Sequence, residues 1–389
     1  MRPTFLPYGL HDINDEDRAA VNTILKGNWI TTGPTVAEFE TAFKKMVNAE
    51  CAVAVNSGTA ALDIAVGSLQ LPFGSEIITT PFTFVATANA IVYNGLIPVF
   101  ADIQEETWNI DPIDVKKKIT SKTKAIICVD YSGQPCDMQE LRQIANDHNL
   151  ILIEDAAHSL GATYNATPIG AIADLTTFSF HPVKHITTGE GGMVTTNNAE
   201  FAKRMLLLRN HGIDKDAGSR YGPSAGWAYD MKVLGRNYRI PDFCCALGIS
   251  QLKRLDEFIL ARRNLVKKYR ELISKTVQVI VEKEDRKSAW HIFPVLLPKG
   301  TNRDAVFQFM RKKNIGVNVH YIPVYKHSFY QENYPVDPSQ FPVTEDVFSR
   351  LITLPLFPRM TTADVKDVVD ALTEALQEVG KNESIGGGL

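Results

Sequence analysis

The chain of 389 residues lacks several features that mark particular classes of protein. No apolar run reaches 18 residues, so we expect no transmembrane helix, and the first residues lack the apolar stretch of a signal peptide. Neither sign of charge is in excess, because 41 Lys and Arg residues face 44 Asp and Glu residues. A nucleic-acid-binding surface is therefore not expected, and an anionic ligand must be bound by a local site.

Cysteine is scarce, and its spacing supports neither a disulfide framework nor a metal site. The five cysteines are Cys51, Cys128, Cys136, Cys244 and Cys245. Their number is odd, and none lies in a CxxC pair or at the Cys/His spacing of a zinc site. Reduced thiols of this kind predict a cytoplasmic protein without a bound metal.

The glycine-rich turn of dinucleotide-binding domains is also missing. That turn, GxGxxG, follows an early strand and opens a helix. Gly-Glu-Gly-Gly at 189–192 comes too late in the chain and lacks the spacing of the third glycine. This argues against a nicotinamide-dependent reductase or epimerase, the alternative from a different class of enzyme.

Apolar runs alternate with amphipathic stretches over the first two thirds of the chain. Helices are expected near 59–69, 83–94, 138–149 and 198–211. Strands are expected at 51–56, 76–81, 97–103, 124–130, 150–155, 176–180 and 191–197. Strands separated by helices predict an α/β fold, with a mostly parallel seven-stranded sheet sandwiched by helices.

The remaining third of the chain has a different pattern. A loop at 212–241 precedes one long helix at about 242–274. Beyond it, strands are expected at 277–282, 291–297 and 316–321, and helices near 303–314, 343–352 and 362–380. A chain of 389 residues is too long for one simple core. We therefore predict a large domain over 1–245 and a smaller C-terminal α+β domain over 246–389.

Ser57-Gly58-Thr59 lies between the first predicted strand and the helix that follows it. Free N–H groups at a helix start, with hydroxyls beside them, form a cradle for a phosphate group. Simple capping of the helix by Ser57 or Thr59 is the structural alternative.

Asp155 and Lys184 follow two further predicted strands. Asp155, at the carboxyl end of a buried strand, would face the crevice in which open α/β sheets bind ligands. Lys184 lies in the turn FSFHPVK, where desolvation can make its amine a nucleophile. Helix capping by Asp155 and an exposed loop lysine are the corresponding alternatives.

A small basic and amide cluster, Gly235-Arg236-Asn237-Tyr238-Arg239, lies in the predicted loop. It could reach phosphate oxygens, or it could remain solvated. Loops often carry binding residues, which favours the first reading.

Taken together, NSGTAAL, PFTFVATANAI, EDAAHSLGA, FSFHPVKHITTGEGGMV and GRNYRIPDF resemble the DegT/DnrJ/EryC1/StrS sugar aminotransferases. These are fold type I enzymes that use pyridoxal 5′-phosphate (PLP). The resemblance covers nearly the whole chain, from Asn28 to Leu356. It implies a homodimer in which the two copies share their active sites.

The resemblance also implies roles for individual residues. Lys184 would form the Schiff base with PLP and Asp155 would pair with the ring nitrogen, so both would be catalytic. Phe84 would stack on the ring and His158 would lie near its phenolic oxygen. Other cofactor-binding residues would be Ser57, Gly58, Thr59, Ser179 and Asn237, the last of which would reach the PLP phosphate of the partner copy. Our candidates for contact with a nucleotide sugar are Trp29, His320 and Tyr321, with partly buried packing as the alternative.

Within the family, EIITTPFTFVATAN, VDYSGQPCDM and VHYIPVYKHSFYQ resemble the subgroup of the pseudaminic acid pathway. That resemblance implies amino transfer from L-glutamate to C4 of UDP-2-acetamido-2,6-dideoxy-beta-L-arabino-hex-4-ulose. The product would be UDP-4-amino-4,6-dideoxy-N-acetyl-beta-L-altrosamine. Another UDP-, dTDP- or GDP-linked keto-sugar is the alternative. A PLP-dependent sugar dehydratase is disfavoured, because a histidine replaces the Schiff-base lysine in that group. A non-catalytic relative is disfavoured because the acid and the lysine are both present.

Overall fold

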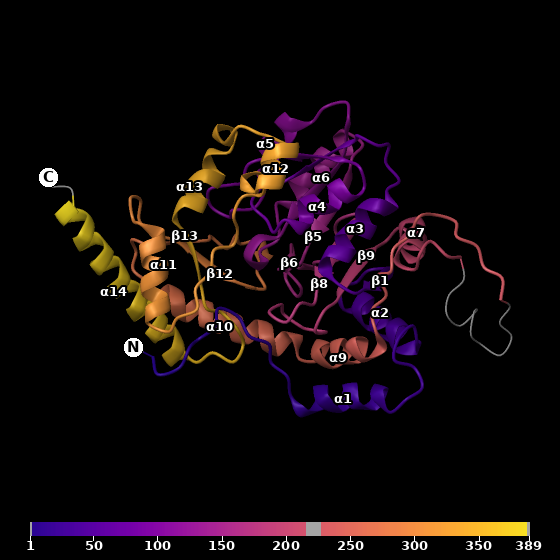
Figure 1. The fold of residues 1–389 in the computed structure, drawn as a ribbon, viewed down its shortest axis with the longest axis horizontal. Coiled ribbons are helices and arrows are strands. Elements are labelled where there is room, and N and C mark those ends of the chain that lie inside the picture. The colour runs from indigo at the N-terminus through magenta and orange to yellow at the C-terminus, as the bar shows by residue number, and fades with distance from the viewer. Residues whose placement is uncertain (1, 215–226, 387–389) are drawn as a thin grey trace.

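The computed structural model describes residues 2–214 and 227–386, so part of the predicted loop at 212–241 lies outside the described residues. Its centre is a seven-stranded sheet (Figure 1). The strand order is β1 (Cys51–Val55), β9 (Gly192–Thr196), β8 (Leu175–Ser179), β5 (Ile151–Asp155), β4 (Thr123–Val129), β2 (Glu76–Thr79), β3 (Ile97–Phe100). β9 is antiparallel to both of its neighbours, and the strands from β8 to β3 are parallel. The predicted mostly parallel α/β fold is therefore confirmed, with one reversed strand.

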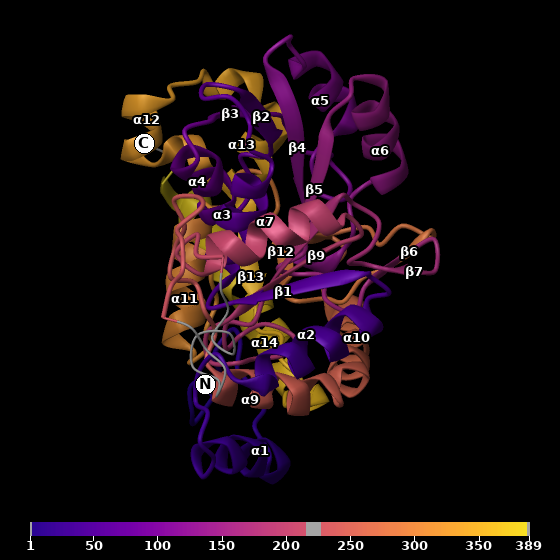
Figure 2. The same cartoon turned by 90° about the vertical axis from the view of Figure 1, so that its right-hand side faces the viewer.

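Helices cover both faces of this sheet (Figure 2). One face packs against α3 (Gly58–Ser68), α4 (Ala86–Tyr93) and α7 (Ala199–Arg209), and the other against α2 (Pro34–Met46), α5 (Pro112–Lys118) and α6 (Met138–Asp147). Neighbouring residues of a strand serve opposite faces: Ile126 packs with the second group of helices and Ile127 with the first. Strands buried on both sides produce the continuous apolar runs seen in the sequence.

The helix predicted at 242–274 is two helices, α9 (Asp242–Leu252) and α10 (Leu255–Leu272). The chain turns between them at Arg254, whose guanidinium pairs with Asp12 at 3.1 Å and with Asp17 at 3.5 Å. These partners are distant in sequence, so the apolar periodicity of the segment could not reveal the break.

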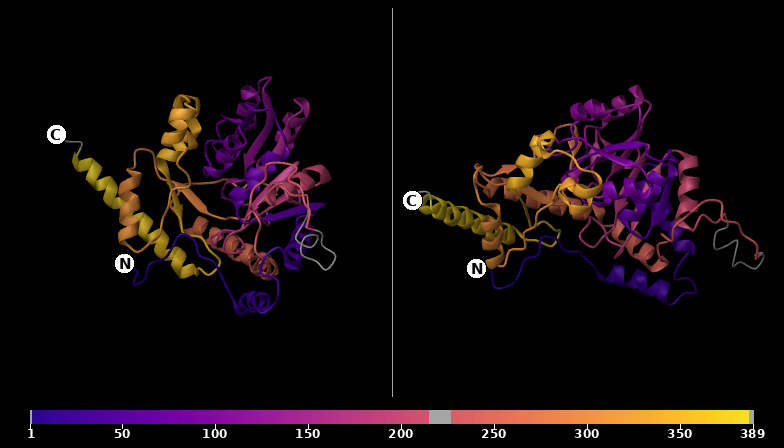
Figure 3. Two further views of the ribbon diagram at one scale, coloured as in Figure 1. Left: turned by 45° about the vertical axis from the view of Figure 1, so that its right-hand side comes forward. Right: turned by 45° about the horizontal axis from the view of Figure 1, so that its top comes forward.

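The C-terminal part is built around a second, antiparallel sheet. Its strands are β10 (Gln278–Val279), β12 (Phe293–Leu296) and β13 (Leu351–Leu354). The helices around it are α10, α11 (Arg303–Lys312), α13 (Pro342–Arg350) and α14 (Thr362–Gly386), whose end projects from the body (Figure 3). Shorter elements are α1 (Asp15–Leu25), β6 (Thr163–Tyr164), β7 (Thr167–Pro168), β11 (Arg286–Lys287), α12 (Ser328–Asn333) and the 3-10 helices η1 (Tyr131–Gly133), η2 (Val324–Lys326) and η3 (Pro338–Gln340). Across the described residues, no helix combines the length and apolar character needed to cross a membrane.

One strand prediction and one helix prediction in this part are corrected. The segment 316–321 forms no strand, and its Asn318 makes only an isolated bridge to Thr353. The third strand is β13, which begins inside the stretch predicted as a helix at 343–352. The helix α13 stops at Arg350 because Leu351 takes an extended backbone and pairs with Leu296 of β12.

The amino-terminal arm, which contains Leu6 and Tyr8, is hydrogen-bonded to the C-terminal part. The N–H of Leu6 donates to the carbonyl of Asn314 at 2.9 Å, and the N–H of Gly316 donates back to Leu6 at 2.7 Å. The N–H of Leu356 donates to the carbonyl of Tyr8 at 2.9 Å. Leu6 of the arm therefore packs in the same hydrophobic core as residues of the C-terminal part. The predicted domain boundary at 245/246 remains a prediction.

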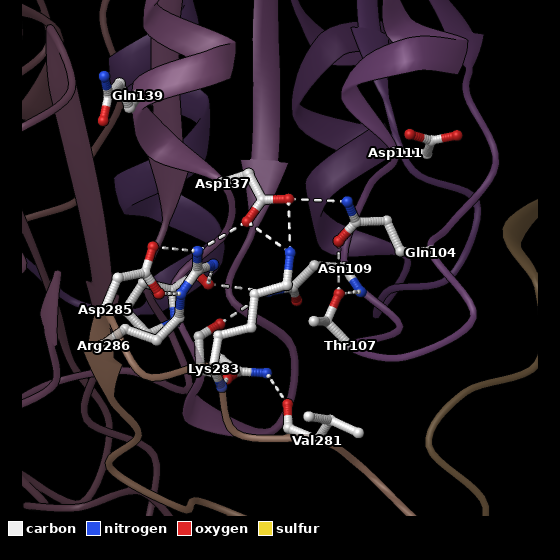
Figure 4. A network of polar contacts seen from close by, with 12 residues as sticks. Gln104, Thr107, Asn109, Asp111, Asp137, Gln139, Val281, Lys283, Asp285 and Arg286 are labelled. Atoms are coloured by element: carbon white, nitrogen blue, oxygen red, sulfur yellow. Dashed lines mark hydrogen bonds and ion pairs between the residues drawn. The ribbon is translucent and has the colours of Figure 1, made fainter.

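A polar network links the start of α6 to β11 and the segment before it (Figure 4). Asp137 pairs with Arg286 at 2.7 Å and with Lys283 at 3.1 Å, and Gln104 donates to it at 2.7 Å. The Asp137 and Arg286 side chains are almost fully buried. The stretch VDYSGQPCDM, which contains Asp137, therefore contributes to the packing between the two parts of the chain.

Candidate active site

A cavity of about 580 Å³ opens at the carboxyl edge of the central sheet. Its walls come from the turns after β1, β2, β5 and β8, together with the arm and the C-terminal part. Ten of the predicted site residues line it: Ser57, Gly58, Thr59, Phe84, Asp155, His158, Ser179, Lys184, His320 and Tyr321. Parallel strands bring their carboxyl ends to one edge, which explains why residues so far apart in sequence meet here.

The start of α3 forms one wall. Ser57 is the N-cap of the helix, and its hydroxyl accepts the N–H of Ala60 at 3.0 Å. The first N–H groups of a helix have no partner within the helix, so those of Gly58 and Thr59 remain available to a ligand. A Cβ on Gly58 would lie 2.8 Å from the Cβ of Ser179, so glycine allows the two turns to approach closely. Capping and phosphate binding are thus compatible at this turn.

Asp155 ends β5 and is buried. Its carboxylate accepts a hydrogen bond from Thr87 Oγ1 at 2.8 Å and one from the N–H of Ala157 at 3.2 Å. Burial raises the pKa of Asp155, and the two hydrogen bonds oppose that shift. The nearby Lys184 also opposes it. The Asp155 carboxylate is therefore positioned to pair with a cationic group.

Lys184 lies on the wall of the same cavity, in the turn after β8. Its N–H donates to the carbonyl of His181 at 2.9 Å, which fixes the turn. Burial lowers the pKa of its amine to about 8. Asp155 opposes this shift and Arg262 adds to it. At pH 7 roughly a tenth of the molecules therefore carry the neutral amine that a nucleophile requires, far more than for an ordinary lysine.

His158 lies between two aromatic partners. Its Nε2 is 2.9 Å from the hydroxyl of Tyr321, and its ring stacks on that of His291. Both imidazoles are buried, and burial holds their pKa values well below the usual range. His291 was not predicted as a site residue, because the apolar run around it indicated only a strand.

His320 and its neighbours form another part of the cavity wall. His320 Nδ1 is 3.0 Å from Thr353 Oγ1, and its ring centroid is 5.2 Å from that of Tyr8. Asn318 also lines this region. Tyr8 and Asn318 were missed, because residues so far apart in the sequence carry no local signal of a shared cavity. Phe84 is 57% exposed and its ring lies 6.0 Å from Tyr321.

Two predicted residues, Trp29 and Asn237, do not line the cavity of this chain. Trp29 is 44% exposed, and Asn237 is exposed on the surface. The neighbouring Arg236 is paired with the buried Asp63 at 3.2 Å. That ion pair anchors the loop that carries Asn237, and the contact of this cluster with a phosphate stays a prediction.

The groups in the cavity fit PLP. The turn at Gly58 and Ser179 offers N–H and hydroxyl donors for a phosphate, while Asp155 offers a carboxylate for a ring nitrogen. Lys184 offers an amine for an aldehyde. His158 Nδ1 is buried and has no protein partner among the described residues, so it can bond to a ligand.

Fold and site together define a PLP-dependent transferase of fold type I. The chain belongs to the DegT/DnrJ/EryC1/StrS aminotransferase family, which it matches over residues 11–373. It is 38% identical over 382 residues to the spore coat polysaccharide biosynthesis protein SpsC of Bacillus subtilis, covering 97% of this chain and 98% of SpsC.

Solved structures of aminotransferases support this family assignment. PseC of Helicobacter pylori, an aminotransferase involved in the biosynthesis of pseudoaminic acid, matches with a TM-score of 0.90 and 30% identity, over 96% of this chain and 100% of PseC. Spr1654 of Streptococcus pneumoniae, in its PLP form, matches with a TM-score of 0.89 and 29% identity, over 96% and 99% of the two chains. The chain is therefore a sugar aminotransferase of a family whose enzymes depend on PLP.

Proposed function

We propose that this enzyme transfers the amino group of L-glutamate to C4 of a UDP-linked 4-keto-6-deoxy sugar. The observation that carries the proposal is that Lys184, Asp155 and the turn at Ser57–Thr59 line one cavity. PLP bound there supplies an aldehyde that bonds to amines and a ring that withdraws electrons.

The residues of the chain would divide the work among them. Gly58, Thr59 and Ser179 would bind the phosphate group, and Phe84 would cover the ring. Asp155 would keep a proton on the ring nitrogen. Lys184 would hold the aldehyde before substrate binds, and its freed Nζ would then remove the α-proton of glutamate as a general base. Two half-reactions in one cavity predict ping-pong kinetics.

The proposed acceptor is UDP-2-acetamido-2,6-dideoxy-beta-L-arabino-hex-4-ulose, as in pseudaminic acid biosynthesis. The similarity to PseC of Helicobacter pylori supports this choice. His320, Tyr321 and Tyr8 form the polar and aromatic wall on which a sugar would rest. The name of SpsC, a spore coat polysaccharide biosynthesis protein, favours a different keto-sugar and keeps that alternative open.

The proposal includes a homodimer with shared sites. Asn237 and Trp29 are exposed outside the cavity of their own chain, so they can reach a ligand only across an interface. In the proposed dimer, Asn237 would contact the PLP phosphate of the partner copy, and Trp29 the nucleotide sugar.

A glutamate-dependent assay against UDP-, dTDP- and GDP-linked 4-keto-6-deoxy sugars tests the proposal, with the aminated carbon identified by NMR. We expect 2-oxoglutarate and a C4-amino sugar with the UDP-linked acceptor. Lys184→Ala is the control, because it should lose both turnover and the visible absorption of lysine-bound PLP while remaining folded. Amination at C3, or no glutamate consumption with any acceptor, would contradict the proposal.

A further inference from the structure

Asp155 is held by a chain of hydroxyl groups that none of the roles above requires. Thr87 Oγ1 lies 2.8 Å from Asp155 Oδ2, and Thr83 Oγ1 lies 2.9 Å from Thr87 Oγ1. Both threonines are at least 98% buried, and both line the cavity. The three side chains thus form a continuous chain of hydrogen bonds in the cavity wall.

The chemistry of the carboxylate determines which group donates each hydrogen bond in this chain. An ionised carboxylate only accepts hydrogen bonds, so Thr87 donates its single hydroxyl hydrogen to Asp155. The remaining lone pairs of Thr87 then accept the hydrogen of Thr83. Donation into a buried carboxylate stabilises its charged form, and a chain of such bonds strengthens each member.

The local fold supports this arrangement. Thr87 is the second residue of α4, and Thr83 lies in the turn before this helix, where its hydroxyl reaches the hydroxyl of Thr87. The positive end of the α4 dipole lies in the same turn and also favours a negative charge. The other titratable groups that interact with Asp155 are Lys184, from the turn after β8, and Tyr321, from the C-terminal part.

We propose that Thr87, supported by Thr83, is a positioning residue that keeps the Asp155 carboxylate charged and in place for the ring nitrogen of the cofactor. This inference rests on the proposed function, since it assumes that PLP occupies the cavity. Thr87 acts through Asp155 and touches no reacting atom.

The experiment measures the affinity of the apoprotein for PLP as a function of pH, without turnover. Protonation of Asp155 weakens binding on the acid side, and the titration of PLP itself is the same for every variant. Thr87→Val should move the acid midpoint upward by about one pH unit or more, because it removes a hydrogen bond to a charged group. Thr87→Ser should keep the wild-type midpoint, and Thr83→Val should give a smaller upward shift.

Thr79→Val is a matched control. Thr79 is fully buried on β2, and its hydroxyl donates to the carbonyl of Ile127 at 2.9 Å instead of to a carboxylate. It should lower the melting temperature without moving the midpoint. An unchanged midpoint in folded Thr87→Val, or an equal shift in Thr79→Val, would overturn the inference. If Thr87→Val does not fold, the shift in Thr83→Val decides.

Failure of the proposed function gives a different result. Asp155→Asn cannot carry the charge, so its PLP affinity should lose the component of the acid limb that Thr87→Val displaces, and only the components due to PLP and to the Lys184 amine should remain. An acid limb in Asp155→Asn identical to that of the wild type would overturn the proposed role of Asp155. A wild-type apoprotein that binds no PLP at any pH would overturn the proposed function as a whole.

Discussion

The imidazole rings of His158 and His291 stack in the wall of the cavity, with centroids 4.4 Å apart and planes inclined by 8°. Both nitrogens of His291 are buried without a protein partner among the described residues. Because burial keeps both imidazoles neutral, each retains one nitrogen that donates and one that accepts. This pair gives the site two uncharged groups directly beside Lys184.

His291→Phe should change the free energy of unfolding by less than about 1 kcal/mol. A phenyl ring preserves the stack and introduces no buried polar atom that needs a partner. His291→Ala should cost about 2–3 kcal/mol, because it removes the ring and leaves a void. Urea denaturation of the two variants checks this, and equal destabilisation would contradict it.

Lys184 should capture PLP at a lower pH than an ordinary lysine. Only the neutral amine attacks an aldehyde, and burial lowers the pKa of this amine to about 8. The rate constant for PLP uptake by the apoprotein should therefore rise with pH and level off above about pH 8. Stopped-flow absorbance measures this rate. A rate that continues to climb towards pH 10.5 would contradict the prediction.

The same shift has a consequence for stability. Because the folded pKa of Lys184 lies below the unfolded value, the native apoprotein binds fewer protons between about pH 8 and 10.5. The contribution of Lys184 is therefore fully unfavourable below pH 8 and disappears as the pH approaches 10.5. Lys184→Met should be more stable than wild-type apoprotein at pH 7, and this difference should fade in alkali.

Asp155→Ala should retain the visible absorption of lysine-bound PLP but lose turnover. Without a carboxylate, the ring nitrogen loses the partner that keeps its proton. Removing one electrostatic group of this kind lowers kcat by about 10²- to 10³-fold. Stopped-flow mixing with glutamate measures the first half-reaction. Near-normal rates in this variant would remove the argument for the pairing with Asp155.

Asp137→Asn should destabilise the protein by about 2–4 kcal/mol, since it leaves the buried Arg286 with a weaker partner. Burial opposes the ionisation of Asp137, but hydrogen bonds from Gln104, Lys283 and Arg286 leave its pKa below the usual value. Its stabilisation is therefore present above the unfolded pKa and is lost as the pH falls through the folded pKa.

Asp285→Asn is the control for that prediction. Asp285 also pairs with Arg286, at 2.6 Å, but its side chain is 37% exposed, so its loss should cost less than about 1 kcal/mol. Thermal unfolding of both variants gives the comparison. Turnover per folded molecule should stay unchanged in each, because the network of Figure 4 lies outside the cavity lining.

Mixing two inactive variants should restore activity if the sites are shared. In a dimer of one Lys184→Ala and one Asn237→Ala copy, one site carries both changes and the other carries neither. Random reassociation of equal amounts should give about a quarter of wild-type activity. No recovery after verified exchange of subunits would contradict the shared site.

The strands of the central sheet could be predicted from the sequence because the pattern that marks each strand is local. Each buried strand is a short apolar run, and all of them except β5 and β8 are followed by a helix. Ser57, Asp155 and Lys184 could be placed at one edge because parallel strands end together.

Contacts between distant segments could not be predicted. The turn at Arg254 depends on Asp12 and Asp17, which lie far back in the chain. β13 follows α13 without an intervening glycine or proline, so no local signal separates them. Thr87 was hidden in a helix prediction, because only the folded chain shows its hydroxyl against Asp155.

The bonded arm at Leu6 makes Tyr8 part of the cavity wall. Deletion of residues 2–8 would remove Tyr8 and loosen the wall around His320. Lys184 and Asp155 would keep their positions in the turns of the large sheet. The segment around Tyr8 is thus a place where the sequence can vary without disturbing the residues positioned for the amine chemistry.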